Sequence, residues 1–308
     1  MNVGVQTGNV VKQFGLETGY AMIREAGFDG IDWNLDQVWN PRETADGHPA
    51  PCIFEEEMPA VRKYFERELA VIGQNGLQIF QAHAPFPAYI PGLPELSARV
   101  PRVYENCIRF CKEAQIPYLV IHGISRAYDG SDMTREEMFQ KNIDLYAPMI
   151  PVIRETGVMV LTENLFRYHE GTCYEAVCSD PDEAVTLLDT LNEMAGGPCF
   201  GLCFDVGHNN LLKWDMASYL RRLGSRVKAL HLHDNDGSRD QHLGPYAGTV
   251  CWTELCSLLR EIGYSGALSF ETFNYYDLKR VMPSVVPVLL QSVAEIGRQF
   301  AGMIGCAS

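Results

Sequence analysis

The sequence predicts one α/β domain over residues 1–308, a (β/α)8 barrel, and three observations lead to this fold class. Eight short apolar segments alternate along the chain with segments of helical spacing. No break in composition marks a second domain. Acidic and histidine side chains recur near the C-terminal ends of six of the predicted strands. Regular alternation favours a parallel sheet, and eight repeats favour closure into a barrel.

The predicted strands share apolar or alternating sequence and end in polar or turn residues. They cover residues 2–7, 30–36, 77–87, 118–123, 157–166, 199–209, 227–233 and 266–272. The segments between them have helical spacing, and several are closed by glycine or opened by a capping residue. The predicted helices cover residues 16–26, 59–75, 97–114, 134–156, 180–194, 214–223, 252–262 and 277–299. We expect Pro148 and Pro151 to interrupt the helix over 134–156.

Residues 37–58 interrupt this alternation. The stretch is irregular, rich in Pro and Gly, and contains Trp39 and His48. It is longer than an ordinary connection between a strand and a helix, so we interpret it as a candidate lid or substrate loop.

Composition narrows the function classes. The formal net charge of −14 disfavours non-specific nucleic-acid binding through a generally basic surface. The ten cysteines form no CxxC pair, which favours reduced thiols, and the first residues lack the pattern of a signal peptide. No stretch has the length of an uninterrupted transmembrane helix. We therefore expect a cytoplasmic protein without a membrane or nucleic-acid partner, and both a monomer and a homo-oligomer stay open.

Residues 228–252 carry the densest group of metal-binding side-chain types. Alternation places His231 and His233 on one face of a strand, and a turn cluster follows. Beyond the turn come Arg239, Asp240 and His242. Imidazole and carboxylate groups together at a strand end suit a divalent metal, whereas the alternative for this segment alone is a hydrated loop.

Three carboxylates complete the pattern. Glu163, Asp205 and Glu271 each follow a strongly apolar run, where an ionised side chain is costly unless it is paired or metal-bound. Any one of them alone could cap a helix or pair with an arginine. Because strand ends of a parallel barrel meet at one mouth, the three would repel one another there. A divalent cation is the simplest group that neutralises them.

Six segments between Leu77 and Thr272 give the chain a resemblance to a known family. They read QAHAPF, VIHG, LTENL, GLCFDVGHNN, HLHDNDGSRDQHLGPYAGTVCW and SFET. In content, order and spacing they resemble the xylose isomerase-like TIM barrel superfamily, in particular its sugar phosphate isomerase/epimerase branch. The resemblance implies one divalent metal (Mn²⁺, Co²⁺, Mg²⁺ or Zn²⁺), with the ligands Glu163, Asp205, His231 and Glu271.

The resemblance also implies an activity. The chain is expected to be a metal-dependent isomerase or epimerase of a small sugar or sugar phosphate, which works by proton abstraction through a metal-held ene-diolate. Glu163 and Glu271 would be the acid/base pair. Arg239 is the nearest candidate for the arginine that contacts substrate oxygens, and we expect Phe86 and Trp33 to pack against the sugar or exclude water.

Two alternatives share the scaffold. The chain also resembles apurinic endonucleases of family 2, which hold up to three Zn²⁺ ions. Their ligand positions would fall on the four ligands Glu163, Asp205, His231 and Glu271. They would also fall on five further candidates for metal or substrate binding, which are His83, His122, His208, Asp240 and His242. The stretch NLFRYHEG after Glu163 departs from that nuclease pattern and favours the sugar branch. The second alternative is a lyase or dehydratase similar to inosose dehydratase.

Overall fold

The computed structural model describes residues 1–39, 44–45, 48–90, 93–125 and 133–305. An eight-stranded parallel sheet has the strand order β11-β10-β7-β6-β5-β2-β1-β12, as in a (β/α)8 barrel. Its strands are β1 (Val3–Gln6), β2 (Gly30–Asn34), β5 (Gln78–His83), β6 (Tyr118–Val120), β7 (Met159–Glu163), β10 (Phe200–Asp205), β11 (Val227–His231) and β12 (Leu268–Phe270). Every one of these strands lies inside a predicted range, so the predicted fold class is confirmed.

The chain divides into two compact units, and each is built from separate stretches of sequence. The first unit comprises Met1–Trp33, Glu68–Phe80 and Cys203–Ser308, and the second comprises Asn34–Arg67 and Gln81–Leu202. Strands β5 and β10 run from one unit into the other.

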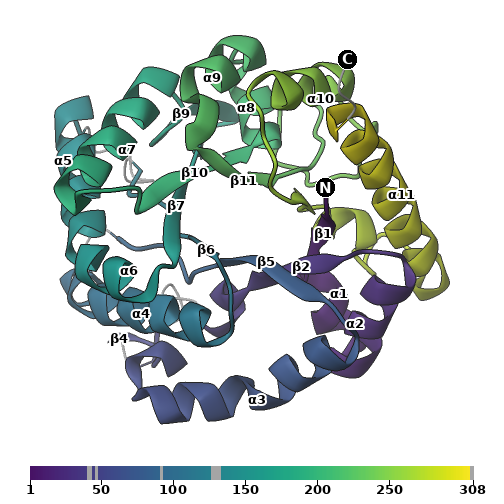
Figure 1. The fold of residues 1–308 in the computed structure, drawn as a ribbon, viewed down its shortest axis with the longest axis horizontal. Helices are drawn as coiled ribbons and strands as arrows, with labels where there is room; N and C mark the ends of the chain where they lie inside the picture. The colour runs from purple at the N-terminus through teal and green to yellow at the C-terminus, as the bar shows by residue number, and fades with distance from the viewer. Residues whose placement is uncertain (40–43, 46–47, 91–92, 126–132, 306–308) are drawn as a thin grey trace. The chain divides into compact units, whose positions relative to one another are not determined.

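In the first unit, β1 is the central strand of the sheet. Val5 lies opposite Ile31 of β2 on one side and Phe270 of β12 on the other. Beyond β12, the N–H of Leu232 donates to the carbonyl of Ser269 at 2.8 Å, which joins the end of β11 to β12. Figure 1 shows the last helix, α11 (Val286–Gly305), running outside β1 between α10 (Trp252–Glu261) and α2 (Leu16–Glu25).

A glycine lets α11 approach the sheet. A Cβ atom at Gly297 would lie 2.5 Å from Val3 Cγ1 and 2.8 Å from Phe270 Cε2. Because both neighbours are buried, a larger side chain at this position would displace the helix from β1 and β12.

In the second unit, β6 pairs in parallel with β5 and β7. Leu119 lies opposite Ala82 on one side and Val160 on the other. Helix α4 (Pro94–Glu113) packs against β6 and α6 (Ile150–Thr156).

Most of the remaining helices match a predicted helix. The predicted interruption by Pro148 and Pro151 is confirmed, because a 3₁₀ turn separates two helices there. Asp180 caps the helix predicted over 180–194, since its carboxylate accepts the N–H of Asp182 at 2.8 Å. The other helices are α1 (Gly8–Phe14), α3 (Met58–Gln74), α5 (Arg135–Tyr146), α7 (Pro181–Ala195), α8 (Val206–Leu212) and α9 (Met216–Leu223).

Several predicted boundaries differ from those in the structure, and two of the differences have a clear physical cause. The strand predicted over 199–209 ends at Asp205, because the Asp205 carboxylate caps the N-terminus of α8 by accepting the N–H of His208. The last helix begins at Val286 instead of residue 277. The backbone carbonyl of Asp277 accepts the N–H groups of Arg280 and Val281, which forms a turn. A 3₁₀ turn that contains Pro283 follows it.

Several elements were not predicted. Helix α1 precedes α2, and a hairpin of β8 (Phe166–His169) and β9 (Thr172–Glu175) follows β7. The long connection over 37–58 contains a second short hairpin, β3 (Thr44–Ala45) with β4 (His48–Pro49), and its residues 40–43 and 46–47 lie outside the described part of the chain.

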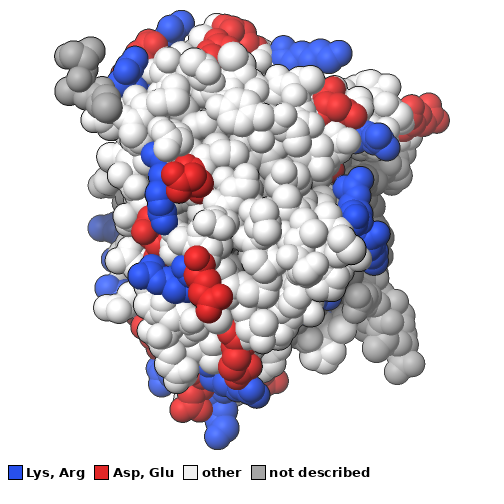
Figure 2. Space-filling view, turned by 90° about the vertical axis from the view of Figure 1, so that its right-hand side faces the viewer, with Lys and Arg blue, Asp and Glu red and all other residues white. Residues whose placement is uncertain are grey.

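The helix lengths and one face of the surface bear on the expectations from composition. Within the described ranges, no helix is long and apolar enough to cross a membrane. Figure 2 shows one face of the molecule, on which Lys and Arg side chains lie close to Asp and Glu side chains around a broad uncharged area. Such a mixed face gives no electrostatic support for binding nucleic-acid phosphates on this side.

The second unit has an aromatic cluster that we expect to control its stability. Phe65 lies with its ring centroid 5.5 Å from that of Phe54 and 4.6 Å from that of Phe110, and all three are buried. Phe65→Ala should lower the free energy of unfolding by roughly 3–5 kcal/mol, because it leaves a cavity among these rings. Urea unfolding measures the change. Tyr64→Ala is the control, since Tyr64 is 56% exposed, and an equal loss in both variants would contradict the prediction.

Candidate functional site

The predicted metal-binding residues fall into buried groups. Among the described residues, the ligand atoms of each group lie within 4.8 Å of one another. The second unit holds His83, His122 and Glu163. The first unit holds two groups, which consist of Asp32, His231 and Glu271 and of His208, His233, Asp240 and His242.

In the group of the second unit, three potential acceptors face one another. His83 Nδ1 lies 3.0 Å from the carbonyl oxygen of Ala84, so this nitrogen carries the proton and Nε2 is left as an acceptor. That Nε2 lies 2.9 Å from His122 Nε2, which in turn lies 3.1 Å from Glu163 Oε2. One proton on His122 can serve only one of its two neighbours. The group therefore brings three possible ligand atoms together and could hold a cation.

In the first unit, His231 lies at the end of β11 between two carboxylates. Its Nε2 is 3.1 Å from Asp32 Oδ2 and 3.5 Å from Glu271 Oε1. A ligand atom of Asp205 also lies within 4.8 Å of one of His231. Asp32, Asp205 and His231 have no exposed surface, and Glu271 is 7% exposed. The structure thus brings three of the four predicted metal ligands together, with Glu163 in the other unit.

Asp32 is a site residue that the sequence analysis missed. It lies within β2, in the predicted strand GIDWNLD, whereas candidates were sought at strand ends. The signal was a lone carboxylate inside a strand that is otherwise buried, which is costly without a partner. That partner, His231, is 199 positions away in sequence.

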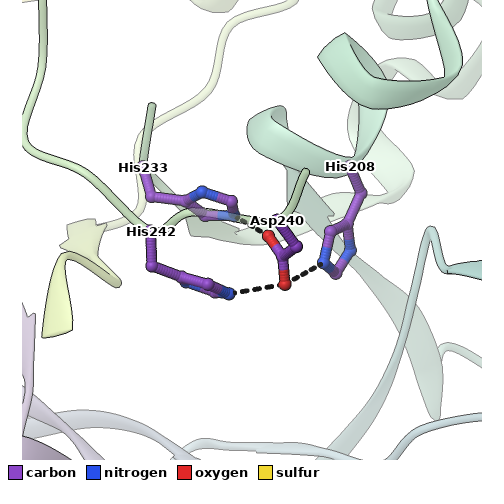
Figure 3. A group of neighbouring side chains, drawn as sticks. All are labelled: His208, His233, Asp240 and His242. Atoms are coloured by element: carbon purple, nitrogen blue, oxygen red, sulfur yellow. Dashed lines mark hydrogen bonds and ion pairs between the residues drawn. The ribbon is translucent and has the colours of Figure 1, made fainter. Parts of the chain in front are cut away.

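The other group of the first unit surrounds Asp240 with three imidazoles (Figure 3). His242 Nε2 lies 2.8 Å from Asp240 Oδ2, and His208 Nε2 lies 3.9 Å from the same oxygen. His233 Nε2 lies 3.9 Å from Asp240 Oδ1. His208, Asp240 and His242 are candidate ligands predicted from the sequence, whereas His233 is not assigned to a site there.

Burial and charge compete in this group. Burial opposes ionisation of Asp240, but the facing imidazoles, His242 first, outweigh it and hold the Asp240 pKa well below its usual range. Burial likewise acts to lower the pKa of His242, yet the charge of Asp240 prevails and raises it. At His233 burial dominates over the charge of Asp205, and its pKa is lowered.

The loop after β11 is held by residues that are not metal-ligand candidates. The Asp234 carboxylate accepts the N–H groups of Asn235 and Val250 and the indole N–H of Trp252, at 2.9, 3.0 and 3.0 Å. Asn235 donates from its side chain to the carbonyl of Gly207 at 2.9 Å. A Cβ atom at position 248 would lie 2.2 Å from the Asn235 carbonyl oxygen, so the loop requires glycine there.

The three predicted substrate-contacting residues have different environments. Trp33 is buried and donates its indole N–H to Glu68 at 3.1 Å. The Phe86 ring lies 4.4 Å from that of His122 between centroids, next to the histidine group of its unit. Arg239 is exposed, and its backbone N–H bonds to Asp236. Contact of each with a substrate stays a prediction.

Comparison with known proteins agrees with this geometry. The family model described as xylose isomerase-like TIM barrel matches residues 20–290. The chain belongs to this family. It is 25% identical over 283 residues to the uncharacterized protein y4fM of Sinorhizobium fredii, which covers 84% of this chain and 81% of that protein.

Two further similarities concern epimerases. A D-psicose 3-epimerase of Enterocloster bolteae is 30% identical over 119 residues, which are 39% of this chain and 35% of that protein. The crystal structure of a D-tagatose 3-epimerase-like protein superposes with a TM-score of 0.71 at 19% identity, over 99% of this chain and 98% of that chain. At this identity the superposition supports the fold.

The scaffold of the β11 loop can be tested separately from its ligands. Asp234→Ala leaves several buried donors without an acceptor and should lower the free energy of unfolding by more than about 2 kcal/mol. Chemical denaturation measures the loss. Asp236→Ala is the control, because Asp236 accepts hydrogen bonds in the same loop but is exposed, and its effect should be much smaller. Equal effects of the two substitutions would show that Asp234 does not hold the loop.

Proposed function

We propose that this chain is a divalent-metal-dependent epimerase or isomerase of a small sugar. One observation carries the proposal, namely that Asp205 and Glu271 both approach His231 in a buried position of the first unit. Buried carboxylates with one imidazole are the oxygen-rich donor set that Mn²⁺ or Mg²⁺ prefers and Zn²⁺ or Co²⁺ accepts.

The proposed ligands are Glu163, Asp205, His231 and Glu271. Glu163 joins the set on the general rule that the C-terminal ends of barrel strands meet at one mouth, since it ends β7 as Asp205 ends β10. When bound, a divalent cation polarises the substrate carbonyl and acidifies the neighbouring C–H group.

The chain's own residues move the proton. Glu163 and Glu271 are the proposed acid/base pair, because a carboxylate that binds through one oxygen keeps the other for a proton. One glutamate removes the proton from the carbon next to the carbonyl, and the other returns a proton at the opposite face or at the adjacent carbon. Both are buried, at 1% and 7% exposed surface, and burial excludes water that would compete for the proton.

The relatives support the substrate class. The D-psicose 3-epimerase and the D-tagatose 3-epimerase-like protein are named for ketoses, which carry a carbonyl next to a C–H group of the kind this chemistry needs. A ketose, with or without a phosphate, is therefore the proposed substrate.

Metal removal should destabilise the protein. Because a cation that binds only the folded state stabilises it, a chelator should lower the thermal midpoint and added Mn²⁺ should restore it. Differential scanning calorimetry measures both changes. In His231→Ala, which removes a proposed ligand, added Mn²⁺ should have little effect. A wild-type midpoint that responds to neither treatment would contradict the metal site.

The acid/base assignment predicts loss of hydrogen exchange. Glu163→Gln and Glu271→Gln should each lower the incorporation of solvent deuterium into a panel of ketoses and ketose phosphates by roughly 10²–10⁴-fold. Mass spectrometry of the sugars measures incorporation, and elemental analysis checks that metal is still bound. Glu170→Gln is the control, since the Glu170 side chain is 86% exposed. Exchange retained in both site variants would refute the assignment.

A second candidate function is a zinc phosphodiesterase acting on abasic DNA. The observation that favours it is the presence of two further groups of possible ligands, around His122 and around Asp240. Elemental analysis separates the candidates, because about one ion per chain supports the sugar enzyme and two or three Zn²⁺ support the nuclease. Cleavage of an abasic duplex is the matching assay, and loss of water from a sugar product would indicate a dehydratase.

A further inference from the structure

His233 is fully buried and faces the carboxylate of Asp205. Its Nε2 lies 3.0 Å from Asp205 Oδ1 and 3.1 Å from Oδ2, so one N–H is shared between both carboxylate oxygens. Its Nδ1 has no hydrogen-bond partner among the described residues. The proton therefore lies on Nε2, since only that nitrogen has an acceptor to serve.

Asp205 is held by a second donor as well. Its Oδ1 accepts the backbone N–H of His208 at 2.7 Å, which is the N-cap bond of α8. The helix end and the imidazole together fix the orientation of this carboxylate. A carboxylate has about four lone-pair sites, so it can accept both of these hydrogen bonds and still bind a cation.

Two neighbours fix the imidazole of His233 in turn, and a third ring supports one of them. An ideal Cβ atom at Gly207 would lie only 1.9 Å from His233 Cε1, so any larger residue at 207 would displace the ring. The ring of His242 stacks on that of His233 with 3.9 Å between centroids and 21° between planes. The ring of Phe273 stacks on the far side of His242 at 4.1 Å.

We propose that His233 is a positioning residue of the metal site, which orients Asp205 through its Nε2–H, and that Gly207 provides the space this ring needs. The inference rests on the proposed function only in taking Asp205 as a metal ligand.

The distances favour this role over direct ligation by His233. The Nε2 atom that faces the neighbouring group is 3.0 Å from Asp205 but 3.9 Å from Asp240. To bind a cation through Nε2, His233 would have to give up its proton and its bond to Asp205. A hydrogen-bonded partner behind a metal ligand raises affinity and fixes geometry without touching the ion.

Three variants test the proposal by metal affinity. His233→Leu removes the donor, Gly207→Ala displaces the ring, and His233→Gln keeps an amide N–H that reaches the place of Nε2. We expect the dissociation constant for Mn²⁺, measured by competition with a fluorescent chelator, to rise by roughly 10–100-fold in the first two variants. In His233→Gln it should stay within about threefold of wild type. His169→Gln, in the exposed hairpin after β7, is the control and should bind like wild type.

The visible absorption spectrum of Co²⁺-loaded protein depends on the geometry of the metal site. A loss of stability alone would not change this spectrum. In protein loaded with Co²⁺, His233→Leu should change the intensity of the visible absorption bands through altered geometry, and His233→Gln should restore the wild-type spectrum. The thermal midpoint of the metal-free variants shows which of them fold. If His233→Leu does not fold, the Mn²⁺ affinities of Gly207→Ala, His233→Gln and His233→Asn test the proposal instead. The Asn side chain is shorter than Gln and cannot reach Asp205, so affinity should fall in His233→Asn but not in His233→Gln.

The outcomes separate this inference from the proposed function. Wild-type affinity for Mn²⁺ in both His233→Leu and Gly207→Ala would overturn the positioning role. An equal loss of Mn²⁺ affinity in His233→Leu and His233→Gln would also overturn it, because that result would indicate that His233 is a direct ligand. A wild-type protein that binds Mn²⁺ but exchanges no sugar hydrogen would refute the proposed function and leave the affinity test valid. A wild-type protein that binds no divalent cation would refute both.

Discussion

Compensation of buried charge is the constraint on which the structure depends. Asp32, Asp205 and His231 have no exposed surface, and removing an ionised carboxylate from water costs several kcal/mol even after the protein relaxes. The chain offsets part of this cost with imidazoles and a helix N-terminus. Around His231 the carboxylates outnumber the imidazoles, and this ratio is an argument for the proposed cation there.

Much of the structure serves to hold these groups in place. Seven of the eight parallel strands carry one of these ionisable side chains within the strand or shortly after it, and close packing at Gly297 keeps α11 on β1 and β12. Behind the ligands, Asp234 ties the loop after β11 to Val250 and Trp252. Hydrogen bonds and small residues behind the ligands therefore determine where the ligands point, which is why the stability of the loop and the geometry of the site are linked.

The sequence predicts the strands and most of the site because both depend on local patterns. A short apolar run that ends in a carboxylate or histidine is visible without any partner, as at Glu163 and Glu271. The residues that were missed depend on distant contacts. Asp32 becomes a site residue only through His231, and His233 only through Asp205, 28 positions away. The strand predicted over 199–209 continues past Asp205, where the structure has an N-cap, because the apolar residues after Asp205 fit either a strand or a helix.

The balance of charge also bears on how many ions the site holds. Around His231, three carboxylates (Asp32, Asp205 and Glu271) share one imidazole in addition to the donors of Asp205. Around Asp240 the proportion is reversed, because three imidazoles surround one carboxylate. A protonated imidazole can balance Asp240, and His242 at 2.8 Å is placed to do so, whereas protons on His231 and His233 cannot balance three carboxylates. This balance supports the proposal that the first cation binds at His231, as the proposed single-metal sugar enzyme requires.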